Sequence, residues 1–333
     1  MPPTPSNTGA TPQGSGPRID HVALRDRVGA FHYRMRINLQ TYHARGVIGV
    51  GRTRFHPENL WQIKFALTLL LKLTGLYGIG RRNTKRFEVV ENEVQLRRLP
   101  DAFQGYRVLH LSDLHLDIDP GITDALIEAL RGLEYDVCVI TGDFRGETWG
   151  DIGPALHETT RLLPHITAPV YAILGNHDFM EIVPPLEAQG VQFLLNETAA
   201  LEKDGATIYL SGVDDPHFYE LQNFEKICEG VPINATKILL SHSAEPYRAA
   251  LACGFDIMLS GHTHGGQICL PGRIPLICNA DHPRYMMQGH WRFHELLGYT
   301  SRGTGVCLVP VRFFCPPEIT LHRLHRRSGS RVG

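Results

Sequence analysis

The stretch YRVLHLSDLH, residues 106–115, decides the fold because a short apolar run ends in a polar D-x-H motif. The apolar run has the length and composition of a strand that is buried on both faces. Asp113 and His115 follow at the point where that strand should end. In open α/β sheets, functional sites form at the carboxyl ends of the strands. This stretch therefore predicts an α/β protein whose site lies at the rim of a sheet.

The same arrangement recurs four times along the chain. The other segments are DVCVITGDF (136–144), PVYAILGNHD (169–178), KILLSHS (237–243) and DIMLSGHTHGG (256–266). Short apolar runs bounded by Gly, Asn and Asp are typical of buried strands. We expect strands over 106–112, 136–141, 169–174, 207–213, 237–241 and 256–260, helices over 122–133 and 152–163, and further strands near 306–309 and 318–321.

The polar endings of the five segments form a consistent set of metal ligands. The set holds two carboxylates, one amide and four imidazoles outside the GNHD motif: Asp113, Asp143, Asn176, His115, His242, His262 and His264. Mixed oxygen and nitrogen donors suit two divalent cations of intermediate hardness, Mn²⁺, Fe²⁺ or Zn²⁺. We expect both side chains of D-x-H and of H-x-H to leave an extended segment toward one point. Each motif alone also occurs in ordinary turns and caps, so the prediction depends on all five occurring in order.

These motifs resemble those of the calcineurin-like metallophosphoesterases, and the resemblance covers about residues 105–322. It implies an α/β (α+β) fold, a β-sandwich of two mixed sheets flanked by helices, with a dinuclear metal centre. By motif match, one metal ion would be bound by Asp113, His115 and His264, the other by Asn176, His242 and His262, with Asp143 as the bridge. Mn²⁺ is the first choice of cofactor, and Fe²⁺ or Zn²⁺ also fit.

The resemblance also implies a mechanism. A metal-bridging hydroxide would attack phosphorus, and His177 would act as the catalytic histidine beside the scissile phosphate. Asp178 would orient His177 through its far ring nitrogen. The chain would then hydrolyse a phosphodiester or pyrophosphate bond.

The flanking sequences narrow the resemblance. GHTHGGQICLPG (261–272), YTSRGTG (299–305) and VRFFCPPEITL (311–321) resemble a membrane-associated bacterial branch. That branch includes a UDP-2,3-diacylglucosamine pyrophosphatase, which forms lipid X and UMP in lipid A synthesis. The classical enzyme of that step has Arg where this chain has His177, so the chain resembles the alternative form. A glycolipid pyrophosphate is therefore the first substrate hypothesis, other soluble or lipid phosphoesters the second, and a non-catalytic scaffold the third.

Four further residues are candidates for substrate binding, each with an ordinary alternative. Arg145 and Arg302 could contact a second phosphate or be solvated arginines. Gly265 and Gly266 could allow close backbone approach beside the metals or form a simple turn.

Composition excludes several classes of protein. The chain has 333 residues, 43% of them hydrophobic and 20% charged, with a net charge of -1. It is therefore not a mostly disordered chain, a collagen, a coiled coil or a polytopic membrane protein. The charge is unevenly spread, because residues 18–86 carry 14 basic and 3 acidic side chains, a net charge of +11.

This unevenness suggests four regions. We expect a disordered tail over 1–17, a basic amphipathic segment over 18–86 that contacts an anionic membrane surface, a catalytic domain over 87–323 and a basic tail over 324–333. The apolar stretch from Leu60 to Gly80 is interrupted by Lys64 and Lys72. It could lie in the membrane interface, pack on the main domain or span the membrane.

Location and partners follow from the same features. The first thirty residues lack the pattern of a signal peptide, and the seven cysteines form no C-x-x-C pair. We expect a cytoplasmic protein, peripheral on the cytoplasmic face of the inner membrane. No nucleic-acid partner is expected, since the basic segment lacks interleaved aromatic residues or a known module.

Overall fold

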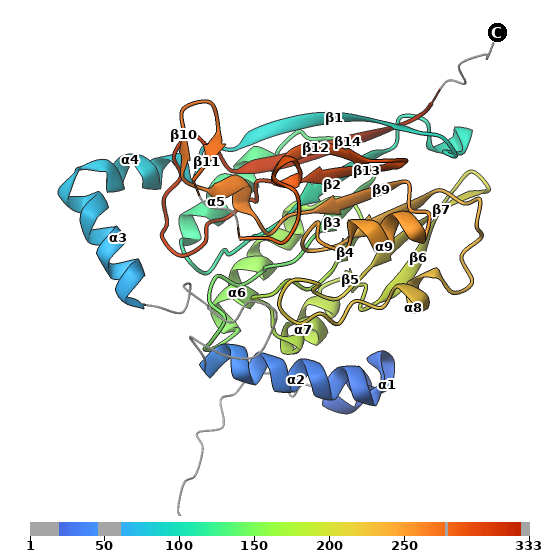
Figure 1. The fold of residues 1–333 in the computed structure, drawn as a ribbon, viewed down its shortest axis with the longest axis horizontal. Coiled ribbons are helices and arrows are strands. Elements are labelled where there is room, and N and C mark those ends of the chain that lie inside the picture. Colours follow the sequence, from blue (N-terminus) through green and yellow to red (C-terminus); the bar gives the residue numbers. More distant parts are fainter. Residues whose placement is uncertain (1–19, 46–60, 277–278, 328–333) are drawn as a thin grey trace, which may run out of the picture.

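Two six-stranded mixed sheets pack face to face, and helices flank them (Figure 1). The computed structural model describes residues 20–45, 61–276 and 279–327. This architecture confirms the predicted α/β sandwich of two mixed sheets. The expected disordered tail over 1–17 and most of the expected basic tail over 324–333 lie outside the described residues.

The first sheet has the strand order β1-β14-β2-β3-β4-β5. Strands β2 to β5 run parallel, β14 is antiparallel to β2, and β1 is parallel to β14. The bounds are β1 Glu88–Leu96, β2 Arg107–Leu111, β3 Val137–Ile140, β4 Val170–Ala172, β5 Val191–Phe193 and β14 Glu318–Arg326.

The second sheet has the order β12-β13-β9-β8-β7-β6, with β13, β9, β8 and β7 parallel. A short hairpin, β10–β11, stands apart from both sheets. The bounds are β6 Glu197–Lys203, β7 Ala206–Gly212, β8 Lys237–Leu240, β9 Ile257–Ser260, β10 Cys269–Leu270, β11 Ile274–Pro275, β12 Gly289–Phe293 and β13 Leu296–Thr300.

Three apolar layers hold the sandwich together. The central layer lies between the sheets and joins Val108 and Val139 of the first to Leu210 and Leu240 of the second. A second layer packs α5 (Pro120–Leu130), α6 (Gly153–Leu162) and α7 (Val183–Glu187) on the first sheet. A third packs α8 (Phe224–Cys228) and α9 (Tyr247–Ala252) on the second sheet. The carboxyl ends of the parallel strands are thereby held rigidly at one rim.

The expected strand near 306–309 is wrong. Val306 and Val309 are buried, but their segment is an irregular loop whose backbone bonds to a side chain, as Cys307 N–H donates to Gln267 Oε1 at 2.7 Å. Strand β1 was not expected, because EVVENEVQL alternates polar and apolar residues and carries three glutamates. It lies at the edge of the sheet, where one side of a strand can remain solvated.

Four helices precede the sandwich: α1 His21–Val28, α2 Ala30–Arg45, α3 Trp61–Leu73 and α4 Leu76–Asn83. The stretch from Leu60 to Gly80, expected as one helix, is broken at Gly75, whose φ of 71° is left-handed. No single described helix is long and apolar enough to cross a membrane. The α3–α4 pair meets that test only jointly, by length and composition, across a bend of 109°.

Part of the charge of the basic segment is paired within the protein, and its contact with an anionic membrane surface stays a prediction. Five of its cations pair with acids of the sandwich. They are Arg27 with Glu187 and Glu197, Arg36 with Asp214, Lys64 with Glu147, and Arg81 and Lys85 with Asp119.

Candidate metal centre

The loops after β2, β3, β4, β8 and β9 meet at one rim and carry all seven predicted ligands. The D-x-H and H-x-H spacing predicted an extended backbone at these loops, and this prediction is wrong. Five of the ligands have left-handed φ values between 41° and 71°: Asp113, His115, Asp143, His262 and His264. Such conformations are unfavourable for non-glycine residues and concentrate at functional sites.

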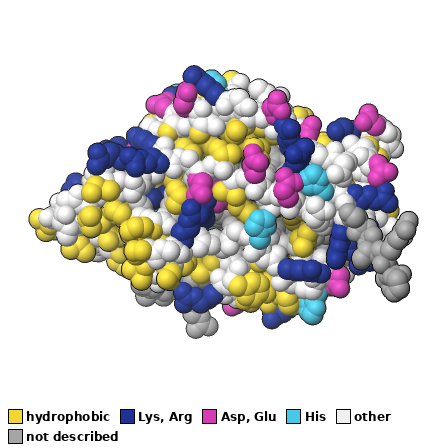
Figure 2. Space-filling model, turned by 90° about the horizontal axis from the view of Figure 1, so that it is seen from above, with side chains coloured by type: hydrophobic (Ala, Val, Ile, Leu, Met, Phe, Trp, Pro, Cys, Tyr) yellow, Lys and Arg dark blue, Asp and Glu magenta, His cyan; other side chains and the backbone are white. Residues whose placement is uncertain are grey.

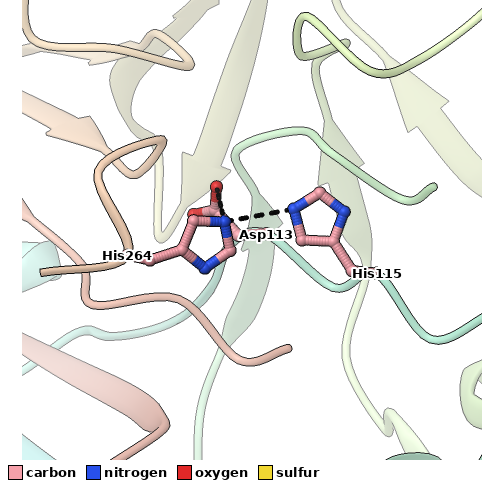
Figure 3. A group of neighbouring side chains, drawn as sticks. All are labelled: Asp113, His115 and His264. Atoms are coloured by element: carbon pink, nitrogen blue, oxygen red, sulfur yellow. Dashed lines mark hydrogen bonds and ion pairs between the residues drawn. The ribbon is translucent and has the colours of Figure 1, made fainter. Parts of the chain in front are cut away.

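One cluster joins Asp113, His115 and His264 (Figure 3). The Nε2 atoms of the two histidines are 3.2 Å apart, and His264 Nε2 is 3.6 Å from Asp113 Oδ1. All three side chains are buried. Two ring nitrogens and a carboxylate oxygen thus converge as a cation would require.

A second cluster joins Asp143, His242, His262 and Asn176. Asn176 Oδ1 lies 2.9 Å from His242 Nε2 and 3.0 Å from His262 Nδ1. Asp143 Oδ2 lies 3.2 Å from His242 Nε2 and 3.6 Å from Nε2 of His115 in the first cluster. Asp143 therefore lies between the clusters, where the motif match placed the bridge.

Backbone carbonyls fix which ring nitrogens can bind metal. A carbonyl only accepts hydrogen bonds, so the nitrogen facing it must carry the proton. His242 Nδ1 donates to Thr141 O at 2.8 Å, His262 Nε2 donates to Asn279 O at 2.8 Å, and His115 Nδ1 donates to Arg145 O. In the neutral form of each ring, the opposite nitrogen, which faces the clusters, is the one that has a lone pair for a metal ion. The residues present therefore fit two divalent cations.

Burial and mutual attraction shape the charges at the site. Burial lowers the pKa of His115 to about 3, so this imidazole is neutral and available as a ligand. Burial also raises the pKa of Asp113 to about 6. Burial would lower the pKa of His242, but the attraction of Asp143 outweighs it and raises the pKa to about 10. A bound cation would have to displace that proton.

His177 lies beside both clusters, close enough to His115 and Asp143 for the three to form a further group of possible metal ligands, although the motif match gives it no ligand role. Its backbone N–H donates to Asp143 Oδ1 at 2.9 Å, and its ring centre is 5.0 Å from that of His115. Its Nδ1 donates to Gly146 O at 2.9 Å. The tautomer is therefore fixed, and Nε2 is the nitrogen left for proton transfer.

The prediction that Asp178 orients His177 is wrong. The Asp178 carboxylate accepts hydrogen bonds from four backbone N–H groups, those of Asp143, Phe144, Arg145 and Gly175, at 2.8 to 3.3 Å. It is fully buried and ties the loop after β3 to the loop after β4. Asp178 therefore positions Asp143, and the Gly146 carbonyl orients His177.

The two candidate arginines differ in their surroundings. Arg302 is not free to bind a phosphate, because its guanidinium is held by Glu318 and by Glu88 at 2.9 Å. Arg145 is buried, stacks 3.9 Å from the centre of the Phe179 ring and donates to Trp149 O at 2.9 Å. Its Nε and Nη1 have no hydrogen-bond partner among the described residues. Neither arginine is solvated, and Arg145 remains a predicted substrate contact.

Glycines permit the tight packing at the rim. Gly265 and Gly266 have φ values of 59° and 87°, and a Cβ on Gly265 would lie 2.7 Å from Arg302 Cγ. Their left-handed turn packs against protein, so close approach to a substrate stays a prediction. Gly175 was not singled out from the sequence, yet a Cβ there would overlap Asp143 Oδ1 and lie 2.7 Å from Asp143 N.

Sequence reasoning also missed a histidine at the same rim. His217 follows β7, its Nδ1 lies 2.8 Å from Glu245 Oε1, and its ring centre is 4.1 Å from that of His262. Burial would lower the pKa of His217, but the hydrogen bond with Glu245 outweighs it and raises the pKa. The segment VDDPH (213–217) resembles no motif used above, and only its position after a strand could have suggested it.

Comparisons with known proteins show which family the chain resembles. Residues 106–266 match the model of the calcineurin-like phosphoesterase family. The Bacillus subtilis metallophosphoesterase YkoQ is 28% identical over 275 residues, covering 80% of this chain and 100% of that protein. Escherichia coli phosphodiesterase YaeI is 26% identical over 261 residues, covering 72% of this chain and 88% of that protein.

A third relative is longer than this chain. A Danio rerio transmembrane protein with a metallophosphoesterase domain is 29% identical over 273 residues, which cover 76% of this chain but 60% of that protein. The family model and these relatives support a calcineurin-like metallophosphoesterase domain over residues 106–266. The chain is a hydrolase that acts on phosphoesters.

Proposed function

We propose that this chain hydrolyses a phosphodiester or pyrophosphate bond with the help of two divalent cations, Mn²⁺ first. The observation that carries the proposal is the position of Asp143. One of its carboxylate oxygens lies 3.2 Å from His242 in one cluster and 3.6 Å from His115 in the other. Two cations held there would polarise phosphate oxygens and lower the pKa of a water molecule.

The chain's own residues supply positioning and proton transfer. Asp113, His115 and His264 would hold one cation, and Asn176, His242 and His262 the other, with Asp143 shared. His177 can carry a proton at Nε2 to the leaving oxygen, because Nδ1 is committed to Gly146. The bond from His177 N–H to Asp143 Oδ1 keeps that ring at a fixed place beside the clusters.

For the substrate we propose UDP-2,3-diacylglucosamine, which would yield lipid X and UMP at the cytoplasmic face of the inner membrane. The support is the resemblance of residues 261–272, 299–305 and 311–321 to the membrane-associated branch, with His177 in place of Arg. The alternative is another phosphodiester, soluble or lipid. The Escherichia coli relative, named as a phosphodiesterase, supports diester chemistry in general.

The test compares two substrates on the full chain with added Mn²⁺, Fe²⁺ or Zn²⁺. We expect release of UMP from UDP-2,3-diacylglucosamine and cleavage of bis-p-nitrophenyl phosphate, both lost in Asp143→Asn. Cleavage of the diester without release of UMP would contradict UDP-2,3-diacylglucosamine as the substrate and would favour another phosphodiester, soluble or lipid. Failure to cleave either substrate with any of the three cations would contradict the proposed diester and pyrophosphate chemistry.

A further inference from the structure

Helices α3 and α4 present an unusual number of apolar side chains to solvent. Seven large ones are at least 40% exposed on these two short helices: Ile63, Phe65, Leu69, Leu70, Leu73, Leu76 and Ile79. Figure 2 shows apolar side chains gathered at the end of the molecule that α3 and α4 form. Contiguous exposed apolar surface of this kind marks a site of interaction with a protein or a membrane.

The opposite face of the two helices is well packed, so the exposure is not a sign of a loosely placed element. Leu71 is buried against Val309 and Val311, with Tyr77 and Phe313 around them. A Cβ on Gly80 would lie 2.7 Å from Val311 Cβ and from the Phe313 ring. The pair therefore has one face fixed to the sandwich and, Phe65 left aside, one apolar face without a partner among the described residues.

The shape and charge of this face fit a lipid surface. At 13 and 8 residues, α3 and α4 are about 20 Å and 12 Å long, and neither alone can cross a hydrocarbon core of about 30 Å. The bend of 109° at Gly75 spreads them over a surface instead. Lys72, Arg82 and Arg86 are exposed in the same segment, and cations beside an apolar helix face favour anionic headgroups.

We propose that α3 and α4 insert their exposed apolar side chains into one leaflet of an anionic bilayer. We call six of these side chains, all of the seven except Phe65, the membrane seat. The loops next to it add exposed apolar residues, since Ile268 and Phe313 pack with α3 and α4 and are followed closely by exposed Leu270 and Phe314.

The membrane seat is coupled to the metal centre at two points. Lys64 of α3 pairs with Glu147, next to the Gly146 carbonyl that orients His177. Arg312 N–H donates to Gly80 O of α4 at 3.1 Å, and the Arg312 guanidinium donates to His264 O at 3.5 Å. If the proposed function holds, this coupling presents the site to a phosphoester in the headgroup layer, so the substrate class is a lipid-linked phosphoester.

The test uses the full chain and vesicles of phosphatidylglycerol with phosphatidylethanolamine, beside vesicles of phosphatidylcholine alone. We expect the wild type to co-sediment with the anionic vesicles and the double variant Leu70→Glu/Leu73→Glu to bind them at least about 10-fold more weakly. Ile233→Glu is the matched control, because Ile233 is 81% exposed on a distant loop and its change should leave binding unaltered. Cleavage of bis-p-nitrophenyl phosphate should be equal in all three proteins.

Equal vesicle binding by the wild type and the double variant would overturn the membrane seat, as would a wild type that stays in the supernatant. A wild-type dimer that the double variant converts to monomer, without vesicle binding, would overturn it in favour of a second copy of the chain. Vesicle binding without hydrolysis of any phosphoester would contradict the proposed function and leave the membrane seat in place.

Discussion

The metal ligands at the rim have left-handed backbone conformations, which are unfavourable for non-glycine residues and are stabilised by the residues around them. Asp113 and Asp143 have φ values of 50° and 58°, and each carboxylate lies against a glycine that has no room for a side chain. Gly261 meets Asp113, and Gly175 meets Asp143. The D-x-H and G-D motifs therefore depend on glycines from other loops, and these contacts hold the ligand atoms in place before any cation arrives.

Replacing His177 should separate catalysis from metal binding. In His177→Ala, the seven ligand side chains keep their supports, so metal content measured by mass spectrometry should stay near the wild-type value. Turnover of bis-p-nitrophenyl phosphate should fall by about 10²- to 10⁴-fold, because the group that carries the proton is gone. Loss of both metal ions from this variant would contradict the role given to His177.

Residue identities at the site could be predicted because the motifs are local, but their supports could not. His115 and Asp143 were found from a short stretch of sequence after a strand. The partner of His177 is a backbone carbonyl, which has no sequence signature. Asp178 was misassigned because the sequence shows that it is adjacent to His177 but not that four backbone N–H groups surround its carboxylate.

At the scale of elements, helix α2 supports the loop that carries the GNHD motif. Arg36 is fully buried and donates to Gly175 O at 3.2 Å and to Asp178 O at 2.9 Å. It also pairs with Asp214 and stacks over the Tyr219 ring. From the sequence, an arginine in a basic helix is expected at the surface. Nothing in the neighbouring sequence indicates that Arg36 is buried and pairs with a carboxylate 178 residues later.

Removing this arginine should destabilise the protein at neutral pH. Burial would raise the pKa of Asp214, but Arg36 and His32 outweigh it and lower the pKa. Arg36→Met should cost about 3–5 kcal/mol of unfolding free energy at pH 7, because it removes the arginine partner of the buried Asp214 carboxylate and leaves it beside His32. Arg25→Met is the control, since Arg25 pairs with exposed Asp26 and the change should alter stability by about 0.5 kcal/mol or less.

The same pair sets a pH dependence with a definite sign. A carboxylate whose pKa is lowered in the folded state stabilises the fold above its unfolded pKa, near 3.8, and ceases to do so as the pH falls through the lower folded value. Urea unfolding at pH 7 and at pH 3 should show this loss in the wild type and a smaller loss in Arg36→Met. An identical acid sensitivity in both proteins would contradict the assignment.

At the scale of the whole molecule, the catalytic sandwich is not independent of the helices before it. Leu24 of α1 is part of the apolar layer over the first sheet, and Leu39 of α2 packs with Phe218 and Tyr219. The predicted boundary at residue 87 followed the change in charge, which is a property of the sequence. Arg27 and Arg36 of that segment pair with carboxylates of the sandwich that lie 160 residues or more later, and such pairing leaves no local trace in the sequence.

A fragment of residues 87–333 should therefore be less stable than the full chain. It lacks Arg36 under the GNHD loop and the helices that cover Phe218. We expect its midpoint of thermal unfolding to fall by at least about 10 °C, since each kcal/mol shifts the midpoint by about 2–4 °C in a domain of this size. Equal midpoints for the two proteins, measured by circular dichroism with the same Mn²⁺, would refute this dependence.

The pairing of β1 with β14 has a consequence for how the protein is made. Glu88 of β1 lies opposite Glu318 of β14, so β1 can pair in the first sheet only after one of the last segments of the chain has been synthesised. The first metal-ligand loop also depends on a late segment, because the Thr304 and Gly305 N–H groups donate to the carbonyls of Ser112 and Asp113 at 2.7 Å. Contacts so distant in sequence slow folding. We therefore expect a nascent chain to acquire its metals only after residue 305 has left the ribosome.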